Sequence, residues 1–337
     1  MTILRLLALA VLLLTPAVAR AAEPVKIRWG IVGTATPSDI TSIIFANKSI
    51  LKHYGTAYTV ETQSFNGSTL IIPALAARAL DFGMLANSAF GFAVLNANLD
   101  IKIVSDELQE GVPGWFSGTW YVLEGSPVRQ VCDLKGKSIA LGTKGAALDL
   151  ALRVMLKKTC SFTADKDYTI VEVRYPNQET FLREKKIDAT VMIPPFVNEA
   201  LKRGGLRALF NNGDAIGRSQ FLVQVARTEF LQQNRAAVEA MMEDYLIAWR
   251  WYLDPKNVEQ ANQYAAAYTK FPVESFRGWA WLKEKDYYRD PDAVPDLEAL
   301  QKDMRLMQEY GFIAQPVDVM KYADLSFIKA AKTRLGK

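Results

Sequence analysis

The chain has 337 residues, half of them hydrophobic and 23% charged, which is the composition of an ordinary globular protein. Its 40 Lys and Arg residues nearly balance 36 Asp and Glu residues, so without a basic run we expect no nucleic-acid partner. The single histidine, His53, excludes a His-rich metal site and leaves one candidate for any Ser-His or Cys-His chemistry. We therefore expect no catalytic residue, no metal and no cofactor.

The first 22 residues have the layout of a secretory signal peptide. Arg5 precedes an apolar run from Leu6 to Leu14, and a series of small residues follows Pro16. The run of about nine residues is too short to span a bilayer, which needs roughly 20. The cleavage region has no cysteine, so we expect no lipid anchor. The prediction is a leader over 1–22 and a mature periplasmic protein, long enough for two domains.

Beyond the leader, predicted strands and helices alternate. A strand over 25–32 is followed by a loop and by a helix over 39–52, whose polar end at His53 is closed by Gly55. The next elements are a strand over 56–65, a helix over 68–79, a strand over 81–85, a helix over 88–96 and a strand over 101–104. This order predicts a parallel sheet with helices on both faces.

A Gly/Pro/Trp loop at 110–118 interrupts the alternation before a second α/β series begins. This series has strands over 119–123, 138–141, 168–173, 189–193 and 219–226, and helices over 146–158, 178–185 and 198–204. Later residues are mainly helical, and the clearest helix, 236–253, ends at Asp254-Pro255.

We interpret 119–123 and 219–226 as two extended crossings between two α/β lobes. Lobe 1 would comprise 23–120 plus 222–337, with the C-terminal helices packed on it, and lobe 2 would comprise 121–221. Two crossings form a hinge, and the cleft between hinged lobes can close on a ligand.

Several segments resemble those of a known family. Residues 133–137, followed by a strand and the loop 143–145, are similar to the start of the second lobe in periplasmic solute-binding proteins of the aliphatic sulfonate, taurine and nitrate type, which are related to thiamine-pyrimidine-precursor binding proteins. Segments 79–83, 186–191, 195–196, 220–222 and 226–230 match in the same order, over roughly 25–253. The resemblance implies a type II-like two-lobe fold, a monomer, and delivery of a small solute to an ABC permease and ATPase without catalysis.

Two departures from the family pattern bear on the ligand. Gly145-Ala146 stands where the family has Gly-Ser or Gly-Thr, and Ile193-Pro194 replaces a Trp-acidic pair. These departures count against taurine.

Ligands of open parallel sheets lie outside the carboxyl ends of the strands. This rule selects Thr34, Thr36, Pro37, Asn66, Gly67, Ser68, Asn87, Ser88, Thr143, Lys144, Gly145 and Ala146. The segments 66–68, 87–88 and 143–146 each open a predicted helix. The free N–H groups at a helix start suit a carboxylate or sulfonate, and glycine lets the backbone approach such a group closely. Plain N-capping by Asn66, Ser68 and Asn87 is the alternative.

Other candidates supply charge and apolar surface. Lys144 and Arg218 could neutralise an anion, with surface solvation as the alternative. Trp120, Tyr175, Pro195 and Phe196 could hold an apolar or aromatic body, or pack in the core and hinge. We therefore predict a small-anion ligand, either a sulfonate or an aromatic or apolar carboxylate.

Cys132 precedes a strand that runs toward the cleft, and Cys160 ends the helix that returns from it. Both would lie at the lobe edge away from the ligand, where a disulfide can form; two free thiols are the alternative. Two alternatives to the importer function stay open: a sensor as partner, and an enzyme whose chemistry would have to use His53. Within the binding-protein class, a pyrimidine-like ligand is the alternative to an anion.

Overall fold

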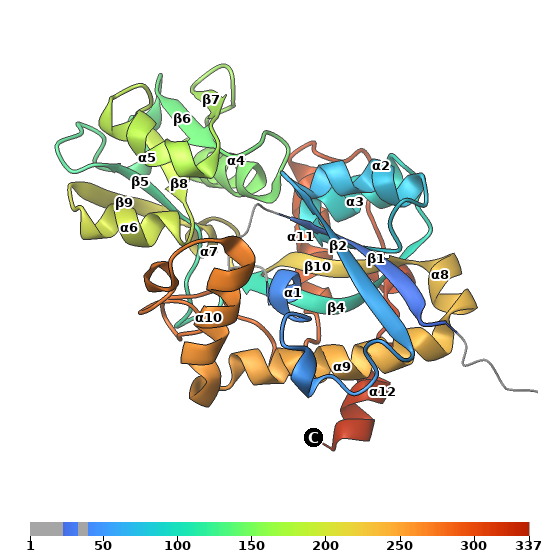
Figure 1. The fold of residues 1–337 in the computed structure, drawn as a ribbon. Helices are drawn as coiled ribbons and strands as arrows, with labels where there is room; N and C mark the ends of the chain where they lie inside the picture. Colours follow the sequence, from blue (N-terminus) through green and yellow to red (C-terminus); the bar gives the residue numbers. More distant parts are fainter. Residues whose placement is uncertain (1–22, 33–39, 337) are drawn as a thin grey trace, which may run out of the picture.

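The computed structural model describes residues 23–32 and 40–336, and these form two five-stranded sheets, each covered by helices (Figure 1). The predicted leader over 1–22 and the candidates Thr34, Thr36 and Pro37 lie outside the described residues. Helices α1 to α12 span Ile40–Ile43, Ile71–Ala76, Asn87–Leu95, Ala147–Cys160, Tyr175–Arg183, Phe196–Lys202, Asn212–Ile216, Thr228–Gln233, Arg235–Leu253, Val258–Thr269, Leu297–Glu309 and Ser326–Leu335. None of the helices within 40–336 is long and apolar enough to cross a membrane.

The first sheet, which defines the first lobe, has the strand order β2-β1-β3-β10-β4. Its strands are β1 (Val25–Val32), β2 (Tyr58–Phe65), β3 (Phe82–Ala86), β4 (Ile101–Glu110) and β10 (Ser219–Arg227). Strand β1 runs parallel to β2 and β3, whereas β10 is antiparallel to both β3 and β4. The sheet is therefore mixed, because β10 enters from the other lobe and runs away from the cleft.

The second sheet, which defines the second lobe, has the order β7-β6-β8-β5-β9. Its strands are β5 (Thr119–Leu123), β6 (Ser138–Leu141), β7 (Thr169–Glu172), β8 (Ala189–Met192) and β9 (Leu206–Asn211). Strands β6, β7 and β8 are parallel, and β5 lies antiparallel between β8 and β9. Strand β9 and helix α7, which follows it, were not predicted.

The two predicted crossings are not free connections. Thr119–Leu123 is hydrogen-bonded to β8 and β9, and Ser219–Arg227 is hydrogen-bonded to β3 and β4, so each belongs to one sheet. The chain instead changes sheets within 111–118 and 212–218, while the expected lobe boundaries at 120/121 and 221/222 fall inside β5 and β10.

The expected helix over 39–52 is wrong. Only the short α1 and the 3-10 turn η1 (Lys48–Ile50) form there. At the end of this segment, the carboxylate of Asp244 on α9 accepts hydrogen bonds from the backbone N–H groups of Lys52, His53 and Tyr54 at 2.7, 2.8 and 3.1 Å, so these groups are not available for helical bonds. These bonds fix the backbone at 52–54, and His53 is not a helix end. Its ring lies 3.7 Å from Glu243 instead.

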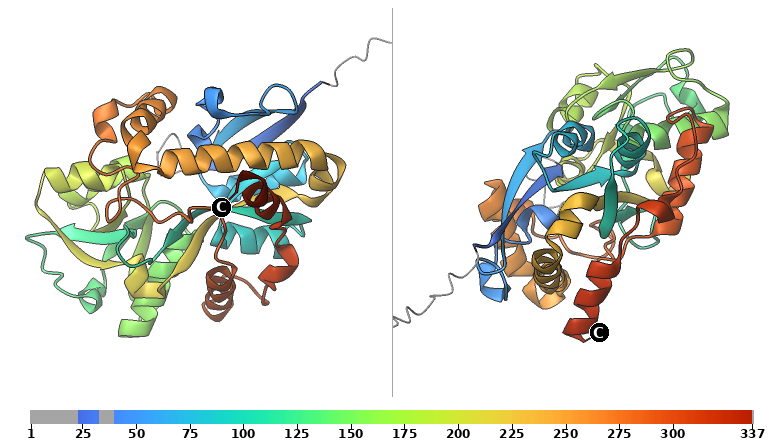
Figure 2. Two further views of the ribbon diagram at one scale, coloured as in Figure 1. Left: turned by 90° about the horizontal axis from the view of Figure 1, so that it is seen from below. Right: turned by 90° about the vertical axis from the view of Figure 1, so that its right-hand side faces the viewer.

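The C-terminal helices pack mainly on the first lobe, as expected. Helix α11 lies against β10 and α3, and α12 lies against α9 (Figure 2). Helix α10 contacts α1 and α9 but stands beside the second lobe (Figure 1). The segment after α10, which includes the 3-10 turn η5 (Val273–Ser275), therefore borders both lobes.

The expected disulfide is confirmed. Cys132, in the 3-10 turn η3 (Val131–Leu134), is bonded to Cys160, the last residue of α4, with 5.5 Å between their Cα atoms. The bond lies before the amino end of β6, at the edge of the second sheet opposite its carboxyl ends.

Candidate functional site

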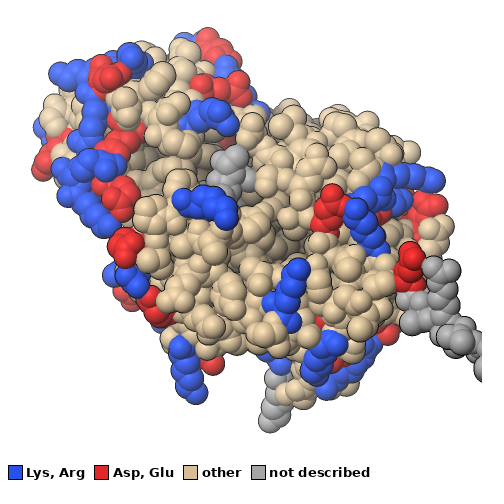
Figure 3. Space-filling view, in the orientation of Figure 1, with Lys and Arg blue, Asp and Glu red and all other residues tan. Residues whose placement is uncertain are grey.

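A hollow separates the two lobes on the face shown in Figure 3. Uncharged residues surround most of it, and Lys or Arg side chains stand on both sides. The carboxyl ends of β2, β3, β6 and β8 place the described candidate loops toward this junction, as expected for a parallel arrangement.

The Asn66-Gly67-Ser68 loop leads into the 3-10 turn η2 (Ser68–Leu70) and α2. No side chain caps this turn, so the simple capping interpretation is wrong for Asn66 and Ser68. The amide oxygen of Asn66 instead lies 3.5 Å from Nη2 of Arg174, which belongs to the second lobe. This long hydrogen bond spans the two lobes.

Asn87 and Ser88 are buried at the start of α3. Asn87 donates to Ser219 Oγ at 3.2 Å and to Asp303 Oδ2 at 3.0 Å, so its amide joins α3 to β10 and α11. Ala86, not Asn87, stands at the N-cap. The hydroxyl of Ser88 has no hydrogen-bond partner within the described part of the chain.

The Thr143–Ala146 loop precedes α4, but carboxylates already use two of its N–H groups. Gly145 donates to Asp149 Oδ2 at 2.7 Å, and Lys144 donates to Glu172 Oε1 at 2.7 Å. The guanidinium of Arg153 holds the Asp149 carboxylate at 2.7 and 3.2 Å. The negative charge expected at this helix start is therefore supplied by the protein itself.

Lys144 and Arg218, the two residues predicted to neutralise an anion, each lie near an acidic residue. Lys144 Nζ lies 3.9 Å from Asp165, a weak exposed pair. Arg218 Nε lies 2.7 Å from Asp296, and its Nη2 donates to Gln109 at 3.0 Å. The structure does not bring these two cations together at one site.

Arg174 is a better candidate, which sequence reasoning missed. It is exposed just before α5, and it forms no ion pair within residues 23–32 and 40–336. An arginine immediately before a Tyr-Pro helix start, at the end of a parallel strand, was the available sequence signal. Its guanidinium faces the first lobe through its contact with Asn66.

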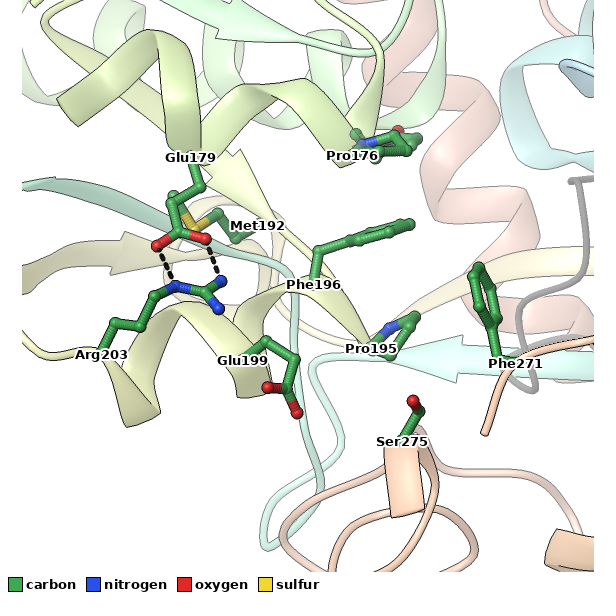
Figure 4. A pocket seen from close by; sticks show the side chains of 10 residues that line it. Pro176, Glu179, Met192, Pro195, Phe196, Glu199, Arg203, Phe271 and Ser275 are labelled. Atoms are coloured by element: carbon green, nitrogen blue, oxygen red, sulfur yellow. Dashed lines mark hydrogen bonds and ion pairs between the residues drawn. The ribbon is translucent and has the colours of Figure 1, made fainter. Parts of the chain in front are cut away.

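Three predicted residues, Tyr175, Pro195 and Phe196, line one pocket of about 170 Å³ (Figure 4). Phe271 and Ser275 line it from the segment after α10. The peptide bond before Pro195 is cis. Trp120, the fourth apolar candidate, is instead fully buried and stacks on Phe210 with ring centres 4.6 Å apart, so it belongs to the core of the second lobe.

Tyr175 packs directly on the backbone of the loop after β6. A Cβ atom at Gly142 would lie 2.7 Å from the tyrosine ring, so only glycine leaves room for it. Burial and the nearby charge of Glu110 raise the pKa of Tyr175 to about 12. The side chain is therefore a neutral O–H donor at neutral pH.

Glu110 lies where the chain leaves the first sheet, and it is completely buried. Its carboxylate accepts hydrogen bonds from Ser117 Oγ and from Gly118 N at 3.1 Å, and the Asn212 side chain also faces it. Burial raises the pKa of Glu110 to about 7. An ionisable group thus sits between the two connections that join the lobes.

The sequence pattern of the NMT1-like family matches residues 20–266, which is more than half of the chain. The chain belongs to the NMT1-like family. Aliphatic sulfonate binding is attributed to an Escherichia coli K12 protein that is 24% identical over 124 residues. That match spans 37% of this NMT1-like chain and 37% of the relative.

Solved structures resemble the NMT1-like protein over nearly its whole length. The periplasmic aliphatic sulphonate binding protein SsuA of Escherichia coli has a TM-score of 0.69 and 18% identity, over 89% of this chain and 92% of its own. SsuA of Xanthomonas axonopodis pv. citri, bound to MOPS, also scores 0.69, with 20% identity over 90% and 99%. The nitrate-binding protein NrtA of Synechocystis PCC 6803 scores 0.69 with 14% identity, over 94% and 90%.

These likenesses confirm the two-lobe periplasmic-binding-protein fold and the expected family resemblance. The relatives named above are described as binding proteins. The desulfurization enzyme DSZB shares the fold at a TM-score of 0.62 and 13% identity, over 92% of this chain and 99% of its own. The fold alone therefore does not decide between binding and catalysis.

Proposed function

We propose that this NMT1-like protein is the periplasmic solute-binding component of an ABC importer and captures a small organic anion between its lobes. The anion would be a sulfonate or an apolar or aromatic carboxylate. The observation that carries the proposal is Arg174, a cation without an acidic partner among the described residues, placed at the lobe junction opposite Asn66. The names of the sulfonate- and nitrate-binding relatives support the same ligand class.

The mechanism is ligand-stabilised closure. Residues 111–118 and 212–218 would form the hinge, and 1–22 would be removed on export. An anion that contacts Arg174 on one lobe and the Asn66 loop on the other binds the closed state better than the open state. Its differential affinity then shifts the population toward closure, the form presented to a permease.

A catalytic function has less support in the described residues. His53 lies beside Glu243 of α9, whereas the pocket is lined by α5, α6 and the segment after α10. The alternatives of a sensor partner and a pyrimidine-like ligand are carried into the experiment below.

Thermal unfolding of the mature protein, freed of bound solute by unfolding and refolding, tests the proposal. The panel comprises alkyl and aryl sulfonates, benzoate, nitrate and pyrimidines. A ligand at about 1,000 times its dissociation constant adds roughly 4 kcal/mol of stability, which raises the midpoint by several degrees.

Arg174→Gln should weaken anion binding at least tenfold, because a charge-assisted hydrogen bond contributes about 1.5–3 kcal/mol. Lys144→Gln is the matched control and should keep its affinity, since Lys144 points to Asp165. A response to pyrimidines alone would keep the receptor and overturn the anion. An equal loss of anion affinity in Arg174→Gln and Lys144→Gln would contradict a specific role for Arg174 in binding.

A further inference from the structure

The pocket of about 170 Å³ joins the two lobes through apolar surface. Tyr175, Met192, Pro195 and Phe196 come from the second lobe, and Phe271 comes from the segment after α10; these five residues define the aryl pocket. We propose that the aryl pocket holds the ring of an aromatic anion, so that the ligands are arenesulfonates or aromatic carboxylates. This inference rests on the proposed function and specifies its ligand class.

The size and lining of the aryl pocket suit one aromatic ring. An apolar cavity of about 150 Å³ is enough to admit benzene. Figure 4 shows Phe196, Pro195, Pro176 and Phe271 around a common space. No ring contact joins Tyr175, Phe196 and Phe271 to one another among the described residues, and Phe271 is 39% exposed, so a ring from the ligand can pack on it.

The charged residues at the edge of the pocket bind one another. The guanidinium of Arg203 forms a two-point contact with Glu179, which also accepts from Arg183 at 2.8 Å. Glu199 accepts from Lys202 at 2.8 Å. These pairs leave the pocket without an unpaired cation for an anionic head group, which favours an apolar occupant.

The head group has a separate place next to the pocket. Tyr175 lines the pocket, and the preceding residue, Arg174, reaches toward Asn66 on the first lobe. The neutral hydroxyl of Tyr175 lies beside Gly142 and the loop that follows β6. An anion attached directly to an aromatic ring fits this arrangement, because consecutive residues of the chain contact its charge and its ring.

Phe271 is the residue that makes the aryl pocket a joint feature of both lobes. Helix α10 ends at Thr269, the next residue Lys270 has a left-handed φ of 64°, and Pro272 prevents the helix from continuing. This local geometry directs the chain to the second lobe and leaves Phe271 39% exposed. A ligand ring would cover that exposed side chain, so ring binding and lobe closure would favour each other.

Calorimetric titration with benzenesulfonate and methanesulfonate tests the inference. Wild type should bind benzenesulfonate at least tenfold more tightly than methanesulfonate. Phe271→Ala and Phe196→Ala should each lose about tenfold for benzenesulfonate and keep their affinity for methanesulfonate. The matched control is Leu201→Ala on α6, because Leu201 is 47% exposed and lies outside the pocket.

The outcomes separate this inference from the proposed function. Equal wild-type affinities for the two sulfonates, or losses in Phe271→Ala and Phe196→Ala that are the same for both, would overturn the aryl pocket and leave the receptor. Failure of both benzenesulfonate and methanesulfonate to bind would overturn the aryl pocket and also the sulfonate ligand of the proposed function. Phe271→Leu keeps apolar volume and should retain the wild-type circular dichroism and melting temperature, so a binding change in it reports on the ring.

Discussion

Single residues at the lobe junction carry chemistry that their sequence neighbours do not reveal. Glu110 ends the buried strand β4 and is surrounded by Ser117, Gly118 and Asn212, all from the two connecting segments. None of these groups is a cation, so the carboxylate has hydrogen bonds but no opposite charge beside it. Desolvation therefore dominates and raises its pKa from 4.5 to about 7.

Glu110→Gln should consequently stabilise the protein at pH 8 relative to wild type and have little effect at pH 5. An acid whose folded pKa is raised contributes stability below its unfolded pKa and loses it as the pH rises through its folded pKa, here between about 4.5 and 7. The full difference corresponds to about 3 kcal/mol. Urea unfolding of both proteins at the two pH values measures it.

Asp106 and Asp303 have pKa values raised in the same direction by burial, so the pH profile of wild type alone does not isolate Glu110. The difference between Glu110→Gln and wild type at each pH isolates the contribution of Glu110. Glu61→Gln, on the exposed part of β2, is the control and should show no such pH-dependent gain. An equal stability change at pH 5 and pH 8 in Glu110→Gln would contradict the argument.

At the scale of elements, the disulfide joins the turn before β6 to the end of α4. It closes a loop over a sequence separation of 28 residues, which in the chain-entropy account contributes about 3.5 kcal/mol. Reductant should lower the melting temperature by several degrees and leave anion affinity nearly unchanged, because the bond lies at the sheet edge opposite the cleft. Thermal scans and titrations with and without reductant check both expectations.

The double variant Cys132→Ser/Cys160→Ser provides the control for the disulfide. It should melt like the reduced wild type and be insensitive to reductant. Identical melting of oxidised and reduced wild type would show that the bond does not contribute to stability.

Elements could be predicted where the cause is local. Strands such as β6 and β8 are short apolar runs, and the long helix α9 has a clear amphipathic period. The path of the chain at 52–54 could not be predicted, because Asp244, about 190 residues away, binds its backbone N–H groups. Strand β9 (Leu206–Asn211) has a weak apolar pattern, because Arg207 and Asn211 are polar.

The candidate site shows the same division. Tyr175, Pro195 and Phe196 were predicted and line the pocket, whereas Phe271 was missed because its segment is brought back by the fold. The use of the Gly145 N–H by Asp149 was a local signal four residues away and could have been found. The pairing of Arg218 with Asp296 joins distant segments and could not.

At the scale of the whole molecule, the two connections between the lobes touch each other. Gly111 has a φ of 66°, and a Cβ atom there would lie 2.3 Å from the carbonyl oxygen of Gly217. A Cβ atom at Gly213 would likewise lie 3.1 Å from the Cα atom of Gly111. Glycine at these points lets the two segments cross closely, and we propose that this crossing is the pivot of lobe closure.

Gly111→Ala should therefore do more than strain one residue. The left-handed φ costs about 1 kcal/mol, and forcing the Gly217 backbone away adds about 1–3 kcal/mol. Gly136→Ala is the matched control, because Gly136 has a φ of 72° but nothing within 4 Å of its Cβ position. Urea unfolding should show a larger loss of unfolding free energy for Gly111→Ala than for Gly136→Ala. Small-angle scattering should show that Gly111→Ala compacts less than wild type when ligand binds. The pivot would lie elsewhere if Gly111→Ala lost no more unfolding free energy than Gly136→Ala and showed the wild-type compaction on ligand binding. The contact between the two connections would then be dispensable for closure.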